Sequence, residues 1–503
     1  MVIEKWSPVT GEKLGEFPIT SGEDVEAAVA RARAAAPGWR ETALECRLDI
    51  LMKAKAIIID EGSEIARKIS EDTGKPLVDS LMTELMQVPL FLDYYAKTAK
   101  KVLSRRRVRT PILFPGKASY IEHYPVGVVA VISPWNFPFQ LAVVPMFSAL
   151  IAGNCVLLKP SEVTPITGML IDELVSRLDL PEGVCQVLHG DGSTGAALTR
   201  ADVDKIFFTG SVATGKKVMK AAAEKPIPVE LELGGKDAMI VCHDAPLKRA
   251  AKAAVWGGLI NCGQMCTSVE RLFVVESIYE AFKRELDREV AKIKVGGPDE
   301  DADMGPITFP PQLETIERHV RDAIEKGATL LRGGKRIERD GQFYEPTVIE
   351  GIEPGMEIYD EETFGPVLPI IKVRDEEEAL RMANQHKYGL TGSVWTRDRK
   401  RGLELASRME CGQAMVNDVV LSVGNPVLPF GGVKASGFGR YHGPEGLLSF
   451  THQKAIMVER AILESEPFWF PYRGKLPTMQ KIFTHLLEGN LPGAVVNLLK
   501  LRG

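Results

Sequence analysis

Five short apolar runs follow one another between Gly127 and Gly235: GVVAVIS (127–133), CVLLKP (155–160), VCQVLHG (184–190), VDKIFFTG (203–210) and PIPVELELGG (226–235). Each run has strand character, and the segments between the runs have helical composition. Alternation of this kind predicts βαβ units, in which helices cover both faces of a parallel sheet. The fold class is therefore α/β, with a Rossmann-like region whose strands end at an edge suited to a dinucleotide.

The residues before this region are predicted to be mainly helical. A turn at Ser7–Gly11 comes first, and Ser21 followed by Asp24 forms a capping pattern for a helix that begins near Asp24. Leucine and isoleucine then repeat at helical spacing up to about Leu103. This segment can supply helices that pack on the sheet.

The segments outside this region and its N-terminal helices differ from one another in character. A basic stretch at 105–109 leads into strand-like residues, which we interpret as a solvated arm. Strand and helix patterns alternate again from about 236 to 434 and predict a second α/β domain. After residue 452 an aromatic and proline-rich stretch precedes an amphipathic tail at 483–501.

Composition excludes several classes of protein. The 503-residue chain has a formal net charge of only -5, which favours neither nucleic acid nor an anionic membrane as a partner. Residues 126–158 carry no charge, but three prolines and several polar residues interrupt them, so we expect a buried strand, turn and helix rather than a transmembrane segment. The N-terminus does not resemble a signal peptide.

The cysteines indicate a reducing compartment. They form no even framework and no paired spacing suited to zinc, so the sequence predicts neither disulfides nor a metal site. We expect the cytoplasm. The seven are Cys46, Cys155, Cys185, Cys242, Cys262, Cys266 and Cys411.

Two glycine-containing turns and one charged pair are candidates for a nucleotide site. The pattern Gly190-x-Gly192-x-x-Gly195 follows a predicted strand, although chance matches to it are common. Gly210 and Ser211 open another helix, either as a phosphate site or as an ordinary N-cap. Lys159 and Glu162 follow a strand where a ribose would lie, but a surface ion pair is the simpler reading.

Candidate catalytic groups are a cysteine and a glutamate. Cys266 in NCGQMCTS has small and polar sequence neighbours, which favour a thiolate, and Cys262 is an equally good candidate on these grounds. Glu232 lies in the apolar strand VELELGGK and alternates with Glu230, so one of the two should face solvent and the other the interior or a cleft. A buried glutamate is either a general base or part of a structural ion pair.

Taken together, these pieces resemble the aldehyde dehydrogenase superfamily over about residues 6–453. Seven motifs occur in the family order. They are ISPWNFP (132–138), KPSE (159–162), FTGS (208–211), LELGGK (231–236), GQMC (263–266), EETFGPV (361–367) and PFGGVKASGFGR (429–440).

The resemblance implies three catalytic roles. Cys266 matches the nucleophile, which attacks the aldehyde to give a thiohemiacetal and then a thioester. Asn136 matches the residue whose carboxamide, with the Cys266 backbone N–H, donates to the resulting alkoxide. Glu232 matches the base that activates water for thioester hydrolysis, which implies a free acid as product rather than a coenzyme A ester.

The resemblance also implies a cofactor site for NAD, with NADP as an alternative. Glu162 favours NAD because a carboxylate beside the ribose repels a 2′-phosphate. In this family the 190–195 glycine pattern is a neighbour of the adenine and does not hold the phosphates. The matching residues are Ile132, Ser133, Pro134, Trp135, Lys159, Ser161, Glu162, Gly192, Phe208, Gly210, Ser211, Thr214, Leu233, Glu362 and Phe364.

The family architecture implies the domain boundaries and the assembly. An NAD-binding domain comprises 1–103 and 127–234, a catalytic domain 235–434, and a small β oligomerisation arm 104–126 with 449–458, which implies a homodimer or homotetramer. Residues 459–503 form a C-terminal extension that could contact a membrane surface or, as the simpler reading, the partner subunit.

The substrate stays open between two enzyme classes. Motifs in the C-terminal part resemble the branch acting on fatty and aromatic aldehydes, which implies medium- or long-chain or aromatic aldehydes. A semialdehyde dehydrogenase is the alternative and predicts a cation at the substrate mouth. A catalytically silent structural member is disfavoured, because Cys266, Glu232 and Asn136 are all present.

Overall fold

The computed structural model describes residues 2–114, 116–459, 465–466 and 468–501. The chain divides into two units, one made of Met1–Val102 with Pro125–Phe450 and the other of Leu103–Tyr124 with Thr451–Gly503. Residue 115 of the predicted arm and residues 460–464, 467 and 502–503 of the predicted extension lie outside the described residues.

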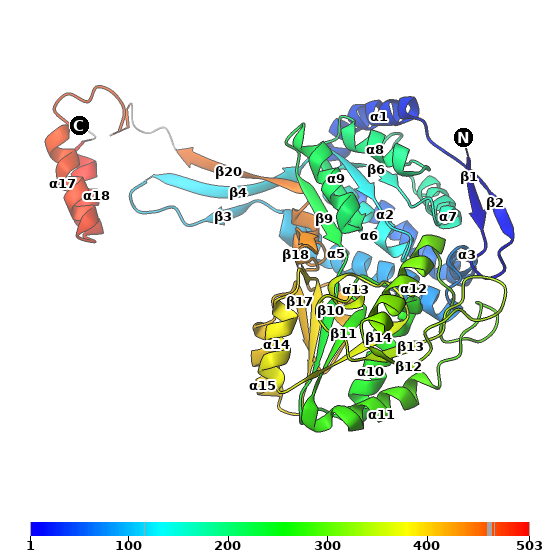
Figure 1. The fold of residues 1–503 in the computed structure, drawn as a ribbon. Coiled ribbons are helices and arrows are strands. Elements are labelled where there is room, and N and C mark those ends of the chain that lie inside the picture. The colour runs from blue at the N-terminus through cyan, green and yellow to red at the C-terminus, as the bar shows by residue number, and fades with distance from the viewer. Residues whose placement is uncertain (1, 115, 460–464, 467, 502–503) are drawn as a thin grey trace. The chain divides into compact units, whose positions relative to one another are not determined.

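The first unit contains the parallel sheet predicted from the five apolar runs (Figure 1). Its order is β19-β9-β8-β5-β6-β7, and only β19 runs antiparallel to its neighbour. The strand order reverses between β5 and β8, so this pair forms the switch point at which such sheets bind ligands. The strands are β5 (Val128–Ile132), β6 (Cys155–Lys159), β7 (Cys185–Val187), β8 (Lys205–Gly210), β9 (Val229–Leu233) and β19 (Gly437–Phe438).

Helices connect these strands as predicted. Residues 126–158 form β5, the fully buried α6 and β6, which confirms the strand, turn and helix expected there. α6 packs on β5 and β6, and α9 packs on β8 and β9. The connecting helices are α6 (Gln140–Ile151), α7 (Pro165–Ser176), α8 (Gly192–Arg200) and α9 (Val212–Ala223).

The N-terminal segment is helical after an antiparallel hairpin of β1 (Val2–Trp6) and β2 (Lys13–Pro18). The predicted capping box is present, because the Ser21 hydroxyl accepts from Asp24 N–H and the Asp24 carboxylate accepts from Ser21 N–H. α1 packs on β5 and β6. The helices are α1 (Gly22–Glu41), α2 (Leu44–Asp60), α3 (Gly62–Thr73), α4 (Leu77–Asp79), the π-helix η1 (Ser80–Leu85) and α5 (Gln87–Leu103).

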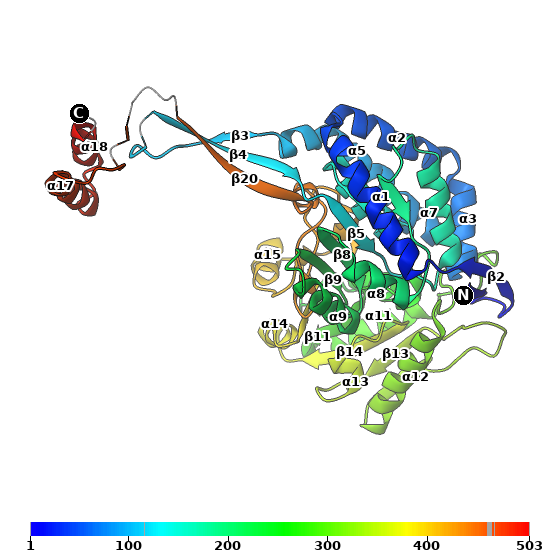
Figure 2. The same cartoon turned by 90° about the horizontal axis from the view of Figure 1, so that it is seen from above.

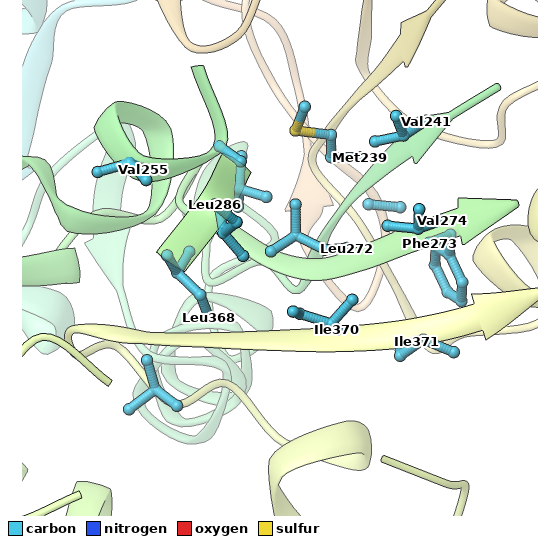
Figure 3. Packing of buried hydrophobic residues seen from close by; sticks show 14 of the residues in the cluster. Met239, Val241, Val255, Leu272, Phe273, Val274, Leu286, Leu368, Ile370 and Ile371 are labelled. Carbon is cyan, nitrogen blue, oxygen red and sulfur yellow. The ribbon is translucent and has the colours of Figure 1, made fainter. Parts of the chain in front are cut away.

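A second α/β region of the same unit is built on a seven-stranded sheet of order β12-β13-β14-β11-β10-β16-β17. Only β12 is antiparallel to its neighbour. Figure 3 shows part of its core, where Leu272 and Ile370 lie opposite one another on β11 and β14. The strands are β10 (Asp237–Val241), β11 (Val269–Val275), β12 (Thr329–Arg332), β13 (Thr347–Glu350), β14 (Val367–Val373), β16 (Thr391–Trp395) and β17 (Gln413–Val416).

Helices cover this second sheet. α10 and α14 both pack on its central strands, and Figure 1 shows α14 and α15 in yellow and α10 and α11 in green around it. The remaining elements are α10 (Leu247–Leu259), η2 (Ile260–Gly263), η3 (Glu276–Ile278), α11 (Tyr279–Val290), α12 (Pro310–Glu325), α13 (Glu357–Asp360), α14 (Glu376–Asn384), β15 (Tyr388–Gly389), α15 (Arg399–Ser407), η4 (Leu421–Gly424), β18 (Val433–Lys434) and α16 (Glu445–Leu448).

The second unit holds a three-stranded sheet and a helical hairpin (Figure 2). The sheet order is β20-β4-β3, from β3 (Arg106–Val108), β4 (Lys117–Pro125) and β20 (Thr451–Glu459), and the basic residues at 105–107 are exposed as expected of an arm. The tail forms two helices, α17 (Leu476–Leu487) and α18 (Leu491–Lys500), whose seam contains Ile482, Ala494 and Leu498. Among the described helices, none is long and apolar enough to cross a membrane.

Candidate active site

A cavity of about 440 Å³ lies at the carboxyl edge of β5, β8 and β9. It brings together residues that are far apart in the sequence, from Met82 to Tyr441, because the turns after these strands meet the loops before β11 and β14. The predicted site residues that line it are Pro134, Trp135, Asn136, Gly210, Ser211, Glu232, Leu233, Cys266, Glu362 and Phe364.

The other predicted cofactor residues lie outside this lining, along the six-stranded sheet. Each lies within a strand, at its end or in the turn or helix that follows, which is where a dinucleotide extends in such folds. They are Ile132 and Ser133 at the end of β5, Lys159, Ser161 and Glu162 after β6, Gly192 at the start of α8, Phe208 in β8 and Thr214 in the first turn of α9.

The polar groups at this edge fit a dinucleotide. The hydroxyls of Ser133 and Thr209 are buried and lack hydrogen-bond partners among the described residues, so they are available to a ligand. Lys159 Nζ donates to Glu162 Oε2 at 2.7 Å, and Glu162 remains partly exposed. The two residues form the ion pair of the simpler reading, but Lys159 is buried and does not lie on the surface, and the exposed part of the Glu162 carboxylate is still available to a ribose.

The two candidate phosphate turns differ in charge. α8 is capped by Asp191, whose carboxylate accepts from Ser193 N–H at 2.8 Å and so places a negative charge where a phosphate would sit. α9 is capped by the neutral Ser211, whose hydroxyl accepts from Thr214 N–H at 3.3 Å. The N-terminus of α9 is therefore the better anion site of the two.

Cys266 follows a backbone segment with unusual conformations. Asn261, Cys262 and Gly263 all have positive φ, at 50°, 57° and 70°. Gly263 requires its missing side chain, because a Cβ there would lie 2.1 Å from the Gly365 carbonyl oxygen. This sharp reversal turns Cys266 toward the cavity, whereas Cys262 is buried and is not among the lining residues.

The environment of Cys266 corrects one expectation. Polar sequence neighbours suggested a readily formed thiolate, but burial raises the pKa of the Cys266 thiol, and the carboxyls of Glu362, Asp237 and Glu232 raise it further. The suggestion is wrong because side chains from other loops, and not the adjacent residues, surround the sulfur. These surroundings favour the neutral thiol over the thiolate.

Asn136 is held at both its main chain and its side chain. Its carbonyl oxygen accepts from Lys75 Nζ at 2.8 Å and from Asn261 Nδ2 at 2.9 Å. Its carboxamide donates to the Gln264 carbonyl at 3.0 Å, two residues before Cys266. The amide donor is thus placed in the cavity beside the loop that carries the sulfur.

The two glutamates of β9 are both buried, so the expectation that one faces solvent is wrong. Glu230 forms an ion pair with Lys205 of the neighbouring strand β8 at 2.7 Å, which compensates for its burial. Glu232 lines the cavity, and neither of its carboxylate oxygens has a partner among the described residues. Burial, followed by the charge of Glu230, holds the pKa of Glu232 well above its usual value.

The loop that carries Glu362 and Phe364 forms the opposite wall. Glu270 accepts from Thr363 N–H at 2.7 Å and from Phe364 N–H at 3.0 Å, and Lys236 pairs with it. Glu362 Oε1 accepts from Gly235 N–H at 3.1 Å, and burial raises the pKa of Glu362 to about 8. The Phe364 ring meets the Trp135 ring edge-on, with centroids 5.4 Å apart.

Several lining residues were not predicted from the sequence. They are mostly apolar and come from η1 and the residue after it, α6, α10, the segment from the end of β17 into η4, and the segment after β19. They include Met82, Met86, Leu141, Trp256, Val420, Leu421 and Tyr441. No lining residue in the described part of the chain is Lys, Arg or His. Only the contacts identify these residues, because an apolar side chain on a helix carries no sequence signal for a cavity.

The buried pair Lys75 and Glu84 was also missed. The sequence carries no signal of their burial, because Glu71, Asp72 and Asp79 place other charged residues in the same segment. A metal site is not evident either, since no group of three or more His, Cys, Asp or Glu side chains among the described residues could hold an ion.

Comparisons with known proteins agree with this geometry. The model of the "Aldehyde dehydrogenase family" matches residues 1–456. A 4,4'-diapolycopene aldehyde oxidase from Methylomonas is 44% identical over 467 residues, covering 93% of this chain and 87% of the relative. A Mycobacterium ulcerans protein whose name refers to succinate semialdehyde and NADP is 37% identical, covering 92% of this chain and 89% of its own.

A solved structure gives the same result for the fold. The Mycobacterium tuberculosis aldehyde dehydrogenase complexed with NAD+ superposes with a TM-score of 0.87 at 37% identity, covering 92% of this chain and 95% of that one. The α/β fold class predicted from the apolar runs is confirmed.

Proposed function

This chain belongs to the aldehyde dehydrogenase family and oxidises an aldehyde to a carboxylic acid with NAD or NADP, and we propose that Cys266, Asn136 and Glu232 carry out the reaction. The observation that supports this assignment best is that all three line one cavity although they come from three separate loops and strands. The role of each follows from its surroundings.

In the first step the Cys266 thiol loses its proton to water and its sulfur forms a bond to the aldehyde carbon. The carbonyl π electrons move to oxygen, and the alkoxide accepts hydrogen bonds from the Asn136 carboxamide and the Cys266 backbone N–H. One such donor changes the rate by roughly 10²- to 10³-fold. A bound nicotinamide would supply the hydride acceptor that is needed for this carbon to become a thioester.

In the second step Glu232 takes a proton from water, and the oxygen attacks the thioester carbon and displaces the Cys266 thiolate. A base must be unprotonated yet able to hold a proton near neutral pH. The raised pKa lets Glu232 hold the proton that water gives up, and no partner among the described residues competes with that water for the carboxylate oxygens.

The cofactor is held by residues along the sheet edge. Lys159 and Glu162 would contact the adenosine ribose, the N-terminus of α9 at Ser211 would face the pyrophosphate, and Glu362 with Phe364 would form the nicotinamide-ribose side. The unpaired hydroxyls of Ser133 and Thr209 and the neutral cap of α9 support this arrangement. The domain boundaries follow the two sheets, with the NAD-binding domain at 1–103 and 127–234 and the catalytic domain at 235–434.

The catalytic assignment is tested by Cys266→Ala and Cys262→Ala. Cys262 is the matched control, because it lies four residues away but is buried outside the cavity lining. With decanal and benzaldehyde, NADH formation should disappear in Cys266→Ala and persist in Cys262→Ala. Residual turnover in Cys266→Ala above about a thousandth of the wild-type rate would contradict the assignment.

The substrate is a medium- or long-chain or aromatic aldehyde. An apolar lining without a cation stabilises an apolar chain and leaves the carboxylate of a semialdehyde unpaired in the cavity. The kcat/KM for decanal should therefore exceed those for acetaldehyde and succinic semialdehyde. A higher value for succinic semialdehyde would favour the semialdehyde alternative.

A matched pair of variants tests this selectivity directly. Leu421 lines the cavity mouth and is exposed, whereas Leu403 is equally exposed on α15 and does not line the cavity. Leu421→Arg supplies the missing cation and should raise the preference for succinic semialdehyde over decanal, and Leu403→Arg should not. Equal effects of both substitutions would show that the lining does not set the preference.

The chain assembles as a homodimer or homotetramer through the β arm at 104–126 and 449–458. β20 is an edge strand of nine residues, and such an edge pairs readily with another chain. Its exposed Met457 is a suitable probe. Met457→Lys should lower the mass measured by light scattering, and an unchanged mass would place the interface elsewhere.

The C-terminal hairpin contacts a membrane surface peripherally. The family match ends at residue 456, and α17 of the hairpin exposes Phe483 and Leu487 on one face and Lys481 elsewhere on the same helix. Exposed aromatic and apolar side chains with nearby cations suit an anionic lipid interface. Phe483→Asp should abolish flotation with phosphatidylglycerol vesicles while Leu403→Asp does not. Loss of the oligomer without any vesicle binding would instead favour packing against the partner subunit.

We place the enzyme in the cytoplasm, where a catalytic thiol stays reduced. Seven cysteines without a disulfide suit that compartment. Detection of the protein in fractionated cells outside the cytoplasmic and peripheral membrane fractions would contradict this location.

A further inference from the structure

We propose that Lys75 and Glu84 are positioning residues that hold Asn136 in the orientation needed to donate to the alkoxide. The proposal rests on the role of Asn136 given above. Neither residue lines the cavity, so both would act through the backbone that carries the amide donor.

The first contact set joins Lys75 to Asn136. Lys75 Nζ donates to the Asn136 carbonyl oxygen at 2.8 Å and to Glu84 Oε1 at 2.7 Å. The same ammonium lies 4.5 Å from the centroid of the Phe137 ring, the next residue in the chain. The Lys75 ammonium therefore contacts both Asn136 and Phe137, and its ion pair with Glu84 holds it in that position.

The second contact set joins Glu84 to the helix that follows Asn136. Glu84 Oε2 accepts from the backbone N–H groups of Phe139 and Gln140, both at 3.0 Å. These donors lie at the start of α6 and have no partner within the helix. A carboxylate at this position also interacts favourably with the positive end of the helix dipole. The turn 136–140 is thus anchored at both ends by one ion pair.

Burial makes these contacts unusually restrictive. The side chains of Lys75 and Glu84 are 1% and 0% exposed, so water cannot replace either partner. Asn261, which also donates to the Asn136 carbonyl, binds through its backbone N–H to Asp79 Oδ2 at 3.1 Å. The network therefore connects the segment 75–84 with both loops that meet at the sulfur, those of Asn136 and Cys266.

The placement of Glu84 depends on the π-helix. η1 covers Ser80–Leu85, and its wider turn directs Glu84 into the interior while Met82 and Thr83 line the cavity. π-turns inside helical segments are rare and occur frequently at functional sites. One turn of the chain thus supplies both a substrate-side wall and the support for the amide donor.

A double-mutant cycle with Glu84→Gln and Asn136→Ala tests the proposal. In Glu84→Gln the side chain keeps one oxygen acceptor but loses its negative charge. In the wild-type background we expect Glu84→Gln to lower kcat by about tenfold or more with KM changed by less than about threefold, because the donor acts on the alkoxide. In the Asn136→Ala background the same substitution should change kcat by less than about twofold, because its target is gone.

Asp72→Asn is the matched control. Asp72 is equally buried and accepts from a backbone N–H of Thr167 at 2.8 Å, but no described contact joins it to Asn136. Its effect on kcat should be the same in both backgrounds. Glu84→Asp, which keeps the charge, should recover more activity than Glu84→Gln. Thermal melting of each variant separates positioning from simple loss of folded protein.

The outcomes are distinguishable. If Asn136→Ala leaves kcat unchanged, the role proposed for Asn136 fails. If Asn136→Ala lowers kcat but the Glu84→Gln effect is the same in both backgrounds, the proposed function stands and the positioning role is overturned.

Discussion

Replacing Glu232 by glutamine should stop the enzyme at the thioester. Glutamine has nearly the same volume, so the cavity keeps its shape, but an amide cannot take a proton from water. The carboxylate oxygens have no described partners to lose, so the substitution breaks no hydrogen bond or ion pair. Formation of the thioester does not require this base and should continue.

The size of the effect follows from general base catalysis. Such a base contributes roughly 10²- to 10⁴-fold, or about 3 to 5 kcal/mol at 1.36 kcal/mol per factor of ten. With hydrolysis slowed to this extent, each active site forms one thioester quickly and then hydrolyses it slowly. We therefore expect a burst of one NADH per active site followed by a steady rate that is roughly 10²- to 10⁴-fold below the wild type.

Stopped-flow absorbance at saturating aldehyde measures both phases, and the trapped thioester adds the acyl mass to Cys266 in a mass spectrum. Glu230→Gln is the matched control on the same strand, because Glu230 is equally buried but paired with Lys205. That variant should lose stability and show no burst. A steady rate of Glu232→Gln within about tenfold of the wild type, with no burst, would refute the role of Glu232.

Three further outcomes follow from the same contacts. Because burial raises the pKa of Cys266, its alkylation by iodoacetamide in the enzyme without cofactor should accelerate as pH rises through the alkaline range, and a pH-independent rate would show that the thiolate is already formed. Burial also raises the folded-state pKa of Glu232, so this carboxyl destabilises the native state as pH rises above its unfolded pKa. In calorimetry, Glu232→Gln should therefore melt at a higher temperature than the wild type at about pH 9. Near pH 4 the two proteins should melt at nearly the same temperature. Removing the carboxylate in Glu162→Ser should raise the kcat/KM ratio of NADP to NAD by about fivefold or more, corresponding to about 1 kcal/mol of charge repulsion, and an unchanged ratio would place the 2′-hydroxyl elsewhere.

Local patterns account for the parts of the fold that were predicted. The five apolar runs became the parallel strands β5 to β9; β5 and β6 are apolar enough to be buried on both faces, whereas VCQVLHG formed the short, half-buried edge strand β7. Ser21 with Asp24 capped α1 because a capping box uses only adjacent backbone. The two helices of the tail were read as one amphipathic stretch, since the turn at 488–490 is too short to interrupt the apolar pattern.

Long-range contacts account for what was missed. Glu230 was expected at a solvent-facing position if Glu232 faced the cleft, and it is buried because Lys205 lies beside it on the neighbouring strand. The pKa of Cys266 could not be inferred from its polar neighbours, because it is raised first by burial and then by Glu362 and Asp237, which come from other segments of the chain. The apolar mouth formed by Met82 and Leu421 has no sequence signal, since the two residues are far apart in the chain.

The sequence by itself therefore determined the α/β class, the strands and caps, and the identity of the candidate catalytic groups, because periodicity and short motifs depend on residues close together in the chain. Only the tertiary structure decided which cysteine faces the cavity, which glutamate has unpaired oxygens, and how a buried lysine and glutamate support Asn136. These properties depend on desolvation and on charges brought together across the fold, and such distances are set when the chain packs.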